Sequence, residues 1–150
     1  MMEIERKFLV NALPDNLERY PKRRLEQAYI STDPVIRVRD SEGEYVLTVK
    51  GKGLFAREEF ELPLTREAYD RLAEKAEGSR ILKDRYRIPY GAFTIELDVF
   101  APPFAPLILA EVEFSTEAAA EAFQPPDWFG KEVTHDPAYT NAAMSQQRRG

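Results

Sequence analysis

Pairs of carboxylates two residues apart recur along this chain of 150 residues. In an extended strand, residues i and i+2 point to the same face, so each pair directs two acidic side chains at one place. Hard divalent cations such as magnesium and manganese are bound by oxygen ligands of this kind. The predicted metal ligands are Glu3, Glu5, Glu59, Glu61, Glu111 and Glu113. Another pair, Glu96 and Asp98, fits a metal or, equally well, the support of neighbouring arginines.

Basic side chains follow the same spacing on other segments of the chain. Clustered cations repel one another until an anion binds, and the planar guanidinium group of arginine matches the oxygens of phosphate. The predicted phosphate ligands are Arg37, Arg39, Lys50, Arg57, Lys83 and Arg85. Acids and bases together predict a site for a metal-bound polyphosphate.

Alternation of charged and apolar residues indicates that β-strands position both sets. On the first segment Glu3, Glu5 and Lys7 share one face, while Ile4 and Phe8 take the other. The same period-two pattern recurs in later segments, most of them separated by turn residues. The expected strands span residues 3–10, 24–31, 35–40, 44–50, 56–62, 81–88, 92–100 and 107–115. Several of these strands carry charges of one sign only on their charged face. A solvated sheet face would gain most from opposite charges placed across from one another, so this sorting instead favours a face that binds ligands of both signs.

This charged face has two interpretations. It is either the solvated outside of a sheet packed on helices, or the lumen of a barrel whose apolar outside is covered by helices and loops. The sorted signs and the eight expected strands favour the second. We therefore predict a mainly β (α+β) fold, an eight-stranded antiparallel closed β-barrel that forms a tunnel with a charged lumen.

A few helices are expected outside the barrel and at the C-terminal end. Thr65 is a predicted N-cap for a helix that ends before Gly78. A second helix is expected from Ser115 or Thr116 to about Phe123. A last helix is predicted to begin at Asp136, with proline in its first turn.

Composition limits the chemistry and the surroundings. No cysteine and a single histidine are present, which excludes disulfides, thiolate metal sites and any mechanism that needs two histidines. The chain carries 21 basic and 26 acidic residues, and this net charge of −5 argues against nucleic acid as a partner. No stretch resembles a signal peptide or a membrane span, so we expect no membrane partner and a cytoplasmic location. We expect one domain over residues 1–150, as a monomer or a homodimer.

The order of the charged motifs resembles a known family. Glu3-Ile4-Glu5-Arg6-Lys7 is similar to the ExExK signature of the CYTH superfamily, the triphosphate tunnel metalloenzymes. The later motifs that keep the family's order are Arg37-Val38-Arg39, Thr48-Val49-Lys50, Arg57-Glu58-Glu59-Phe60-Glu61, Lys83-Asp84-Arg85, Glu96-Leu97-Asp98 and Glu111-Val112-Glu113. The resemblance covers nearly the whole chain, and short bacterial inorganic triphosphatases are most similar.

This resemblance implies hydrolysis of a small-molecule triphosphate. The expected reaction is metal-dependent conversion of tripolyphosphate to pyrophosphate and phosphate inside the tunnel, with magnesium or manganese as the metal. The alternatives are a nucleoside or thiamine triphosphatase, a class IV adenylyl cyclase, and a non-enzymatic barrel that binds polyphosphate.

Two further residues are candidates for proton transfer. Lys7 shares the face of Glu3 and Glu5, and Tyr29 is expected to face inward beside Gln27. Together Lys7 and Tyr29 could orient or deprotonate a water, and a lysine acting as a base would make the rate rise at alkaline pH. The alternative is that Lys7 binds phosphate and Tyr29 only lines the wall.

Overall fold

The computed structural model describes residues 2–147 as strands linked by short loops and a few short helices. The strands are β1 (Met2–Val10), β2 (Lys22–Thr32), β3 (Val35–Ser41), β4 (Glu44–Lys50), β5 (Ala56–Leu64), β6 (Ile81–Tyr90), β7 (Phe93–Phe100), β8 (Ile108–Phe114) and β9 (Phe129–Glu132). The helices are α1 (Arg66–Ala73), α2 (Glu117–Ala122) and α3 (Asn141–Ser145), with 3₁₀ turns η1 (Leu17–Arg19) and η2 (Pro137–Tyr139). Among these residues no helix has the length and apolar character needed to cross a membrane.

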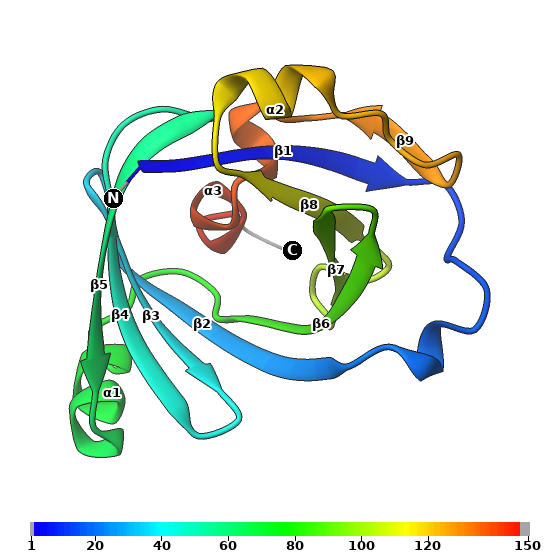
Figure 1. Ribbon diagram of the computed structural model, residues 1–150. Coiled ribbons are helices and arrows are strands. Elements are labelled where there is room, and N and C mark those ends of the chain that lie inside the picture. The colour runs from blue at the N-terminus through cyan, green and yellow to red at the C-terminus, as the bar shows by residue number, and fades with distance from the viewer. Residues whose placement is uncertain (1, 148–150) are drawn as a thin grey trace.

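Eight of the strands close into an antiparallel barrel (Figure 1). Neighbours follow the order β5, β4, β3, β2, β6, β7, β8, β1, and pairing of β1 with β5 joins the two ends of the sheet. That joint is short, because only Met2–Ile4 of β1 pair with β5. Farther along, the same edge of β1 pairs with β9 through Phe8 and Val10. The predicted closed barrel is therefore confirmed, and β9 is an additional strand.

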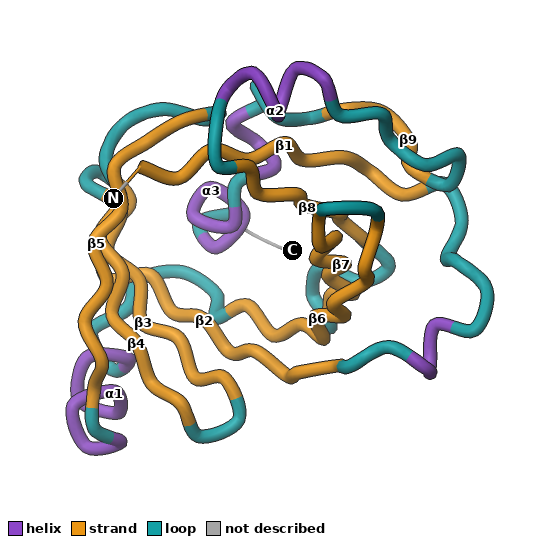
Figure 2. Tube along the Cα trace, viewed as in Figure 1, coloured by secondary structure: helices purple, strands orange, loops and turns teal. Residues whose placement is uncertain are grey.

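The apolar outside of the barrel is covered on two sides. Next to β1, β7 and β8, the segment of α2 and β9 contributes Ala120, Phe123 and Phe129 to a buried cluster that includes Ile4 and Phe8. Figure 2 shows α2 outside this wall and α1 outside the opposite one. There Tyr69 and Ala73 of α1 pack on β2 and β3. The strand faces predicted to be apolar thus form the contact surface for the helices.

The outer face of β5 differs from this pattern. Phe60 and Leu62 point outward as predicted, yet 59% and 48% of their surfaces are exposed. Helix α1 follows β5 directly and folds back over β2, β3 and β4, so it covers Leu64 but not the middle of β5. The expectation that helices and loops cover the whole apolar outside is wrong for this strand.

The C-terminal helix closes one end of the barrel. Ala142 and Met144 of α3 pack with Tyr29 of β2, Ile81 of β6 and Leu109 of β8. Figure 1 shows α3 within the ring of strands. At this end of the barrel, the inward positions of the strands are therefore apolar and not charged.

A helical turn begins after Asp136 as predicted, but it does not continue into the last helix. Asp136 caps only the short turn η2, by accepting a hydrogen bond from the backbone N–H of Ala138. Thr140 then caps α3 itself, accepting from the N–H of Ala143 at 3.1 Å. Two capping residues in succession divide the expected helix. Helix α1 also ends earlier than predicted, at Ala73 rather than just before Gly78.

Phe123 is the centre of the aromatic packing beneath α2 and provides a test of the outer core. Its ring contacts those of Phe8, Tyr90, Phe93, Phe114 and Phe129, with centroid separations of 5.4 to 6.4 Å. Phe123→Ala should lower the free energy of unfolding in urea by about 3–5 kcal/mol, because it leaves a cavity in this cluster.

The matched control is Phe60→Ala, a change of the same size on an exposed ring. It should alter the free energy of unfolding by less than about 0.5 kcal/mol. Equal losses in the two variants would contradict the assignment of the core.

Candidate active site

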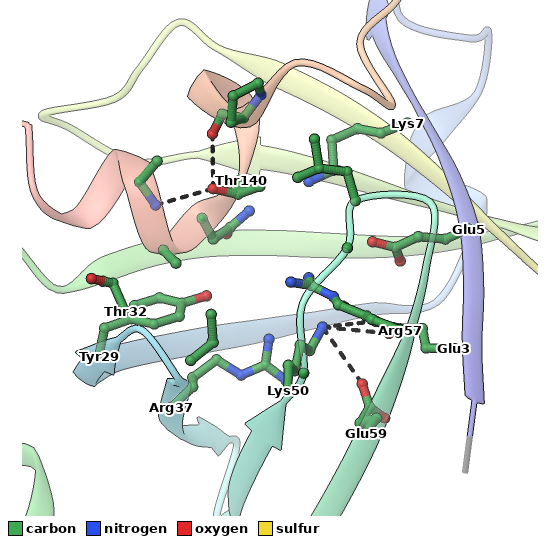
Figure 3. Close-up of a pocket in the computed structure, with 18 of the residues that line it drawn as sticks. Glu3, Glu5, Lys7, Tyr29, Thr32, Arg37, Lys50, Arg57, Glu59 and Thr140 are labelled. Atoms are coloured by element: carbon green, nitrogen blue, oxygen red, sulfur yellow. Dashed lines mark hydrogen bonds and ion pairs between the residues drawn. The ribbon is translucent and has the colours of Figure 1, made fainter.

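A cavity of about 880 Å³ occupies the barrel lumen and brings the predicted site residues together. Its lining includes Glu3, Glu5, Lys7, Tyr29, Arg37, Arg39, Lys50, Arg57, Glu59, Glu61, Lys83, Arg85, Glu111 and Glu113. Figure 3 shows Glu5 and Lys7 projecting into this space from β1, and Tyr29 and Arg37 from the opposite side. Their common location follows from strand parity, whereas their individual roles stay predictions.

Many lumen charges form ion pairs across neighbouring strands. The sorting of signs by strand does not leave these charges unpaired, because the register places a basic residue directly opposite an acidic one on the neighbouring strand. The pairs are Lys7 with Glu111 at 3.9 Å, Lys50 with Glu59 at 3.5 Å and Arg85 with Asp98 at 2.7 Å. Arg57 also lies 3.5 Å from Glu3. The prediction that sorted charges lack partners is thus wrong for these residues.

Two arginines are exceptions on the basic side. Arg37 donates from Nη2 to Thr48 Oγ1 at 3.3 Å, and its buried Nε–H has no hydrogen-bond partner among the residues that the structure describes. Arg39 donates from Nε to Gln27 Oε1 at 2.8 Å. Neither arginine forms an ion pair within residues 2–147. Burial, together with repulsion from Arg37 and Arg85, lowers the pKa of Arg39 to about 9. Positive charge is therefore concentrated around Arg37 and Arg39.

Carboxylates are the exceptions on the other side. Glu5 of β1 lies directly opposite Glu113 of β8, so two like charges share one register position. Burial, then repulsion from Glu111 and Glu3, raises the pKa of Glu5 to about 8. Burial and repulsion from Glu3 also raise the pKa of Glu113. Lys7 and Lys50 offset only part of this repulsion, so negative charge is concentrated around Glu5.

The acidic donors fit a hard divalent cation by their chemistry. They are all carboxylate oxygens, and the raised pKa values of Glu5 and Glu113 mark negative charge that a cation would stabilise. In the described part of the chain, however, no three acidic or histidine side chains are gathered closely enough to form a ready-made metal site. A cation held here would share its coordination with a ligand such as phosphate.

The pKa of Glu5 predicts how stability depends on pH in the presence of a chelator. Between the ordinary value near 4.5 and about 8, the folded protein keeps a proton that the unfolded chain releases. The folded state binds more protons in this window, so this group makes stability fall as pH rises. Glu5→Gln removes the effect, and its melting temperature should match the wild type at pH 5 and exceed it by roughly 2–4 °C at pH 8.5.

Glu121→Gln is the control for this comparison, because it removes an acid that is exposed on α2. Its melting temperature should track the wild type at both pH values. A Glu5→Gln advantage that is the same at pH 5 and pH 8.5 would contradict the raised pKa.

Asp98 and Glu96 can now be assigned more narrowly. Asp98 is fully buried between Lys83 and Arg85, with both contacts at 2.7 Å. Burial alone would raise its pKa, but these two cations outweigh burial and lower it. Asp98 therefore supports the basic residues. Glu96 lines the cavity and accepts a hydrogen bond from Arg87 at 2.9 Å, so Arg87 is neutralised at the rim.

Lys7 and Tyr29 do not meet. Lys7 Nζ donates to the backbone oxygen of Tyr139 at 3.0 Å, on the β1 side of the cavity. The hydroxyl of Tyr29 lies 3.5 Å from Gln27 Nε2, on the opposite side (Figure 3). No hydrogen bond joins the two side chains in the region that the structure describes. Any joint action would have to pass through a ligand or water between them.

Several lining residues were not predicted as part of the site, among them Lys52 and Asn141. Lys52 enters the lining from residues 51–53, which connect β4 to β5. Gly53 has φ +122°, and a Cβ there would lie 2.4 Å from the oxygen of Ala56, so this turn requires glycine. Asn141 lines the cavity because α3 folds back into the barrel end. No local pattern in the sequence marks that return.

The closed antiparallel barrel, with basic and acidic side chains gathered around one lumen, defines the class of this protein as a β-barrel with a charged lumen. Residues 1–140 match the CYTH domain, and the chain belongs to this family.

Similar proteins of known name agree with this membership. An inorganic triphosphatase from Nitrosomonas europaea is 44% identical over 151 residues, covering 97% of each chain. An inorganic triphosphatase from Acetivibrio thermocellus is 39% identical, covering 95% of this chain and 92% of the relative. A crystal structure of the inorganic triphosphatase NE1496 has 40% identity and a TM-score of 0.74, covering 99% of this chain and 97% of that one.

Proposed function

We propose that this protein is an inorganic triphosphatase that hydrolyses tripolyphosphate to pyrophosphate and phosphate. The observation that carries the proposal is the distribution of charge in the lumen. Among residues 2–147, Arg37 and Arg39 form no ion pair, and Glu5 lies opposite Glu113, so positive charge is concentrated in one part of the cavity and negative charge in another. A metal-bound triphosphate complements both. The names of the two relatives support the same substrate.

The basic residues act by binding and by neutralising charge. Water attacks a terminal phosphorus, a new P–O bond forms, and the bridging P–O bond breaks so that pyrophosphate leaves with its oxygen. Such a transition state asks little covalent chemistry of the protein and gains most from preorganised positive charge. The residues proposed to supply it are Lys7, Arg37, Arg39, Lys50, Arg57, Lys83 and Arg85.

The acidic residues are proposed to hold magnesium or manganese against the phosphate chain. The candidate ligands are Glu3, Glu5, Glu59, Glu61, Glu111 and Glu113. A bound divalent cation would polarise phosphate oxygens and make a coordinated water easier to deprotonate. Glu3 lies 3.0 Å and Glu59 3.5 Å from the ammonium group of Lys50. Their negative charge therefore also holds Lys50 in the lumen.

We propose that Lys7 and Tyr29 act from opposite walls of the cavity. Lys7 lies 3.9 Å from Glu111 and is placed to bind phosphate beside the acidic residues. Tyr29 presents its hydroxyl to the lumen and is placed to orient a water or a phosphate oxygen. We further propose that the protein works in the cytoplasm, as a monomer or homodimer.

A phosphate-release assay tests the proposed function directly. Tripolyphosphate, ATP, thiamine triphosphate and pyrophosphate are each incubated with the protein and magnesium, manganese or chelator. We expect phosphate and pyrophosphate in equal amounts from tripolyphosphate, with both metals supporting turnover and chelator abolishing it. Faster release from ATP or thiamine triphosphate would reject the inorganic substrate, and release from none would reject a triphosphatase.

A further inference from the structure

Asn141 connects the helix that closes the barrel to the basic floor of the cavity. It is the first residue of α3, it is buried, and it lines the cavity. Its Oδ1 accepts a hydrogen bond from Lys83 Nζ at 2.8 Å and another from Gln27 Nε2 at 3.3 Å. An amide oxygen has two lone pairs, so both are occupied by these donors.

The orientation of the Asn141 amide follows from its neighbours. Arg39 can only donate, and it directs both Nε and Nη2 at Gln27 Oε1. The NH₂ group of Gln27 must therefore face Asn141. Lys83 is also only a donor. Two independent donors thus require that the oxygen of Asn141, and not its NH₂ group, points at Lys83.

Lys83 is held by a small number of contacts that leave one direction open. Its ammonium group has three N–H donors and its side chain is 1% exposed. One donor reaches Asp98 Oδ2 at 2.7 Å and a second reaches Asn141 Oδ1 at 2.8 Å. Because Lys83 lines the cavity, the third donor is available to a phosphate oxygen. Two fixed acceptors determine where the third N–H points.

We infer that Asn141 is a positioning residue, which aims Lys83 at the bound phosphate chain. The inference rests on the proposed function for the nature of the ligand. With Asp98 as its only remaining acceptor, the ammonium group would be free to rotate about that contact. Binding the anion would then have to fix the orientation of the Lys83 ammonium group. The conformational entropy lost in doing so would lower the affinity for the anion.

Helix α3 does not need the Asn141 contacts to stay in place. Ala142 and Met144 anchor it in the apolar cluster at the barrel end, and Thr140 caps its first turn. The backbone oxygen of Ser145 also accepts a hydrogen bond from the N–H of Ser79 at 2.7 Å. The role of Asn141 toward Lys83 is therefore separable from the attachment of the helix.

A double-mutant cycle measured by binding tests this inference. Titration calorimetry with tripolyphosphate and chelator gives the Kd without turnover for the wild type, Asn141→Ala, Lys83→Met and the double variant. We expect Asn141→Ala to weaken binding about tenfold in the wild-type background, the size expected for a hydrogen bond to a charged group. In the Lys83→Met background the same change should alter the Kd less than about twofold, because the residue it acts through is gone.

Two further variants separate positioning from structure. Asn141→Leu keeps the side-chain volume without the acceptor, and should weaken binding as much as Asn141→Ala. Met144→Ala removes a buried apolar group from the same helix, and should lower the melting temperature while leaving the Kd within about twofold.

The outcomes are distinct. Equal losses in both backgrounds, full rescue by Asn141→Leu, or weaker binding in Met144→Ala would each overturn the positioning role. If the wild type binds tripolyphosphate and Asn141→Ala binds it equally well, the inference fails while the proposed function stands. Absence of binding by the wild type in chelator would overturn the inference, whereas the proposed function is decided separately by phosphate release in the presence of metal.

Discussion

Glu111→Gln is expected to reduce metal-dependent tripolyphosphate hydrolysis about 10³-fold while leaving the barrel folded. Glu111 lies within 3.9 Å of Lys7 and opposite it in the sheet. Burial alone would raise its pKa, but Lys7, Arg85 and Lys83 outweigh burial and hold the pKa well below its ordinary value. The carboxylate is therefore charged at all working pH values and available to a cation. Glutamine keeps the shape but supplies no charge.

Glu111→Gln should not weaken the binding of tripolyphosphate itself. Without Glu111, the three cations that surround it lose their common counter-charge. Titration with tripolyphosphate in chelator should therefore show a Kd equal to or lower than that of the wild type. Loss of turnover with retained anion binding separates a metal ligand from a residue needed only for folding.

Glu121→Gln serves as the control, because this exposed acid on α2 lies outside the lumen. Its turnover and Kd should match the wild type. Phosphate release by Glu111→Gln at the wild-type rate would contradict the assignment of Glu111 as a metal ligand. The stability contributed by ionised Glu111 is present above about pH 4.5 and is lost as pH falls toward the lowered pKa. Glu111→Gln should therefore have a lower melting temperature than the wild type at pH 7.

Strand parity made the lumen largely predictable from sequence. A period of two places Glu3, Glu5 and Lys7 on one face and Ile4 and Phe8 on the other, whatever the neighbouring strands are. This argument uses only local geometry, so it needs no knowledge of the tertiary structure. It therefore identified the residues that surround the cavity but not the contacts between them.

Register is the part that sequence could not supply. Whether Glu113 of β8 lies opposite Glu5 or opposite Lys7 depends on how β1 and β8 align, and these strands are about a hundred residues apart in the chain. A shift of two residues would preserve every side-chain face and exchange the partners. The distinction between paired cations and the unpaired Arg37 therefore appears only in the folded barrel. The return of α3, which places Asn141 beside Lys83, has the same long-range origin.

Arg37→Met is expected to weaken tripolyphosphate binding roughly 10²-fold and, in the ligand-free protein, to raise the melting temperature by roughly 2–4 °C. The loss of affinity follows from the buried Nε–H that has no partner until an anion binds. The gain in stability has the same cause, because a buried donor without a partner is costly in the empty cavity. Methionine fills similar volume without a donor or a charge.

Repulsion adds to this gain. Burial is the main reason that the pKa of Arg39 falls to about 9, and the charges of Arg37 and Arg85 lower it further. Removing the charge of Arg37 relieves part of that repulsion, which stabilises the folded state of the ligand-free protein. Calorimetric melting without phosphate and titration with tripolyphosphate measure the two effects separately. Arg71→Met, a matched change on the exposed face of α1, should alter neither.

The combination of opposite signs is what makes this prediction informative. An arginine that served only the structure would lower the melting temperature when it is replaced, and a ligand-binding arginine with good partners would leave the melting temperature nearly unchanged. Only a cation held in the lumen without its counter-ion loses affinity and gains stability together. A lower melting temperature in Arg37→Met would contradict this view of the cavity, because it would mean that Arg37 already has the partners it needs.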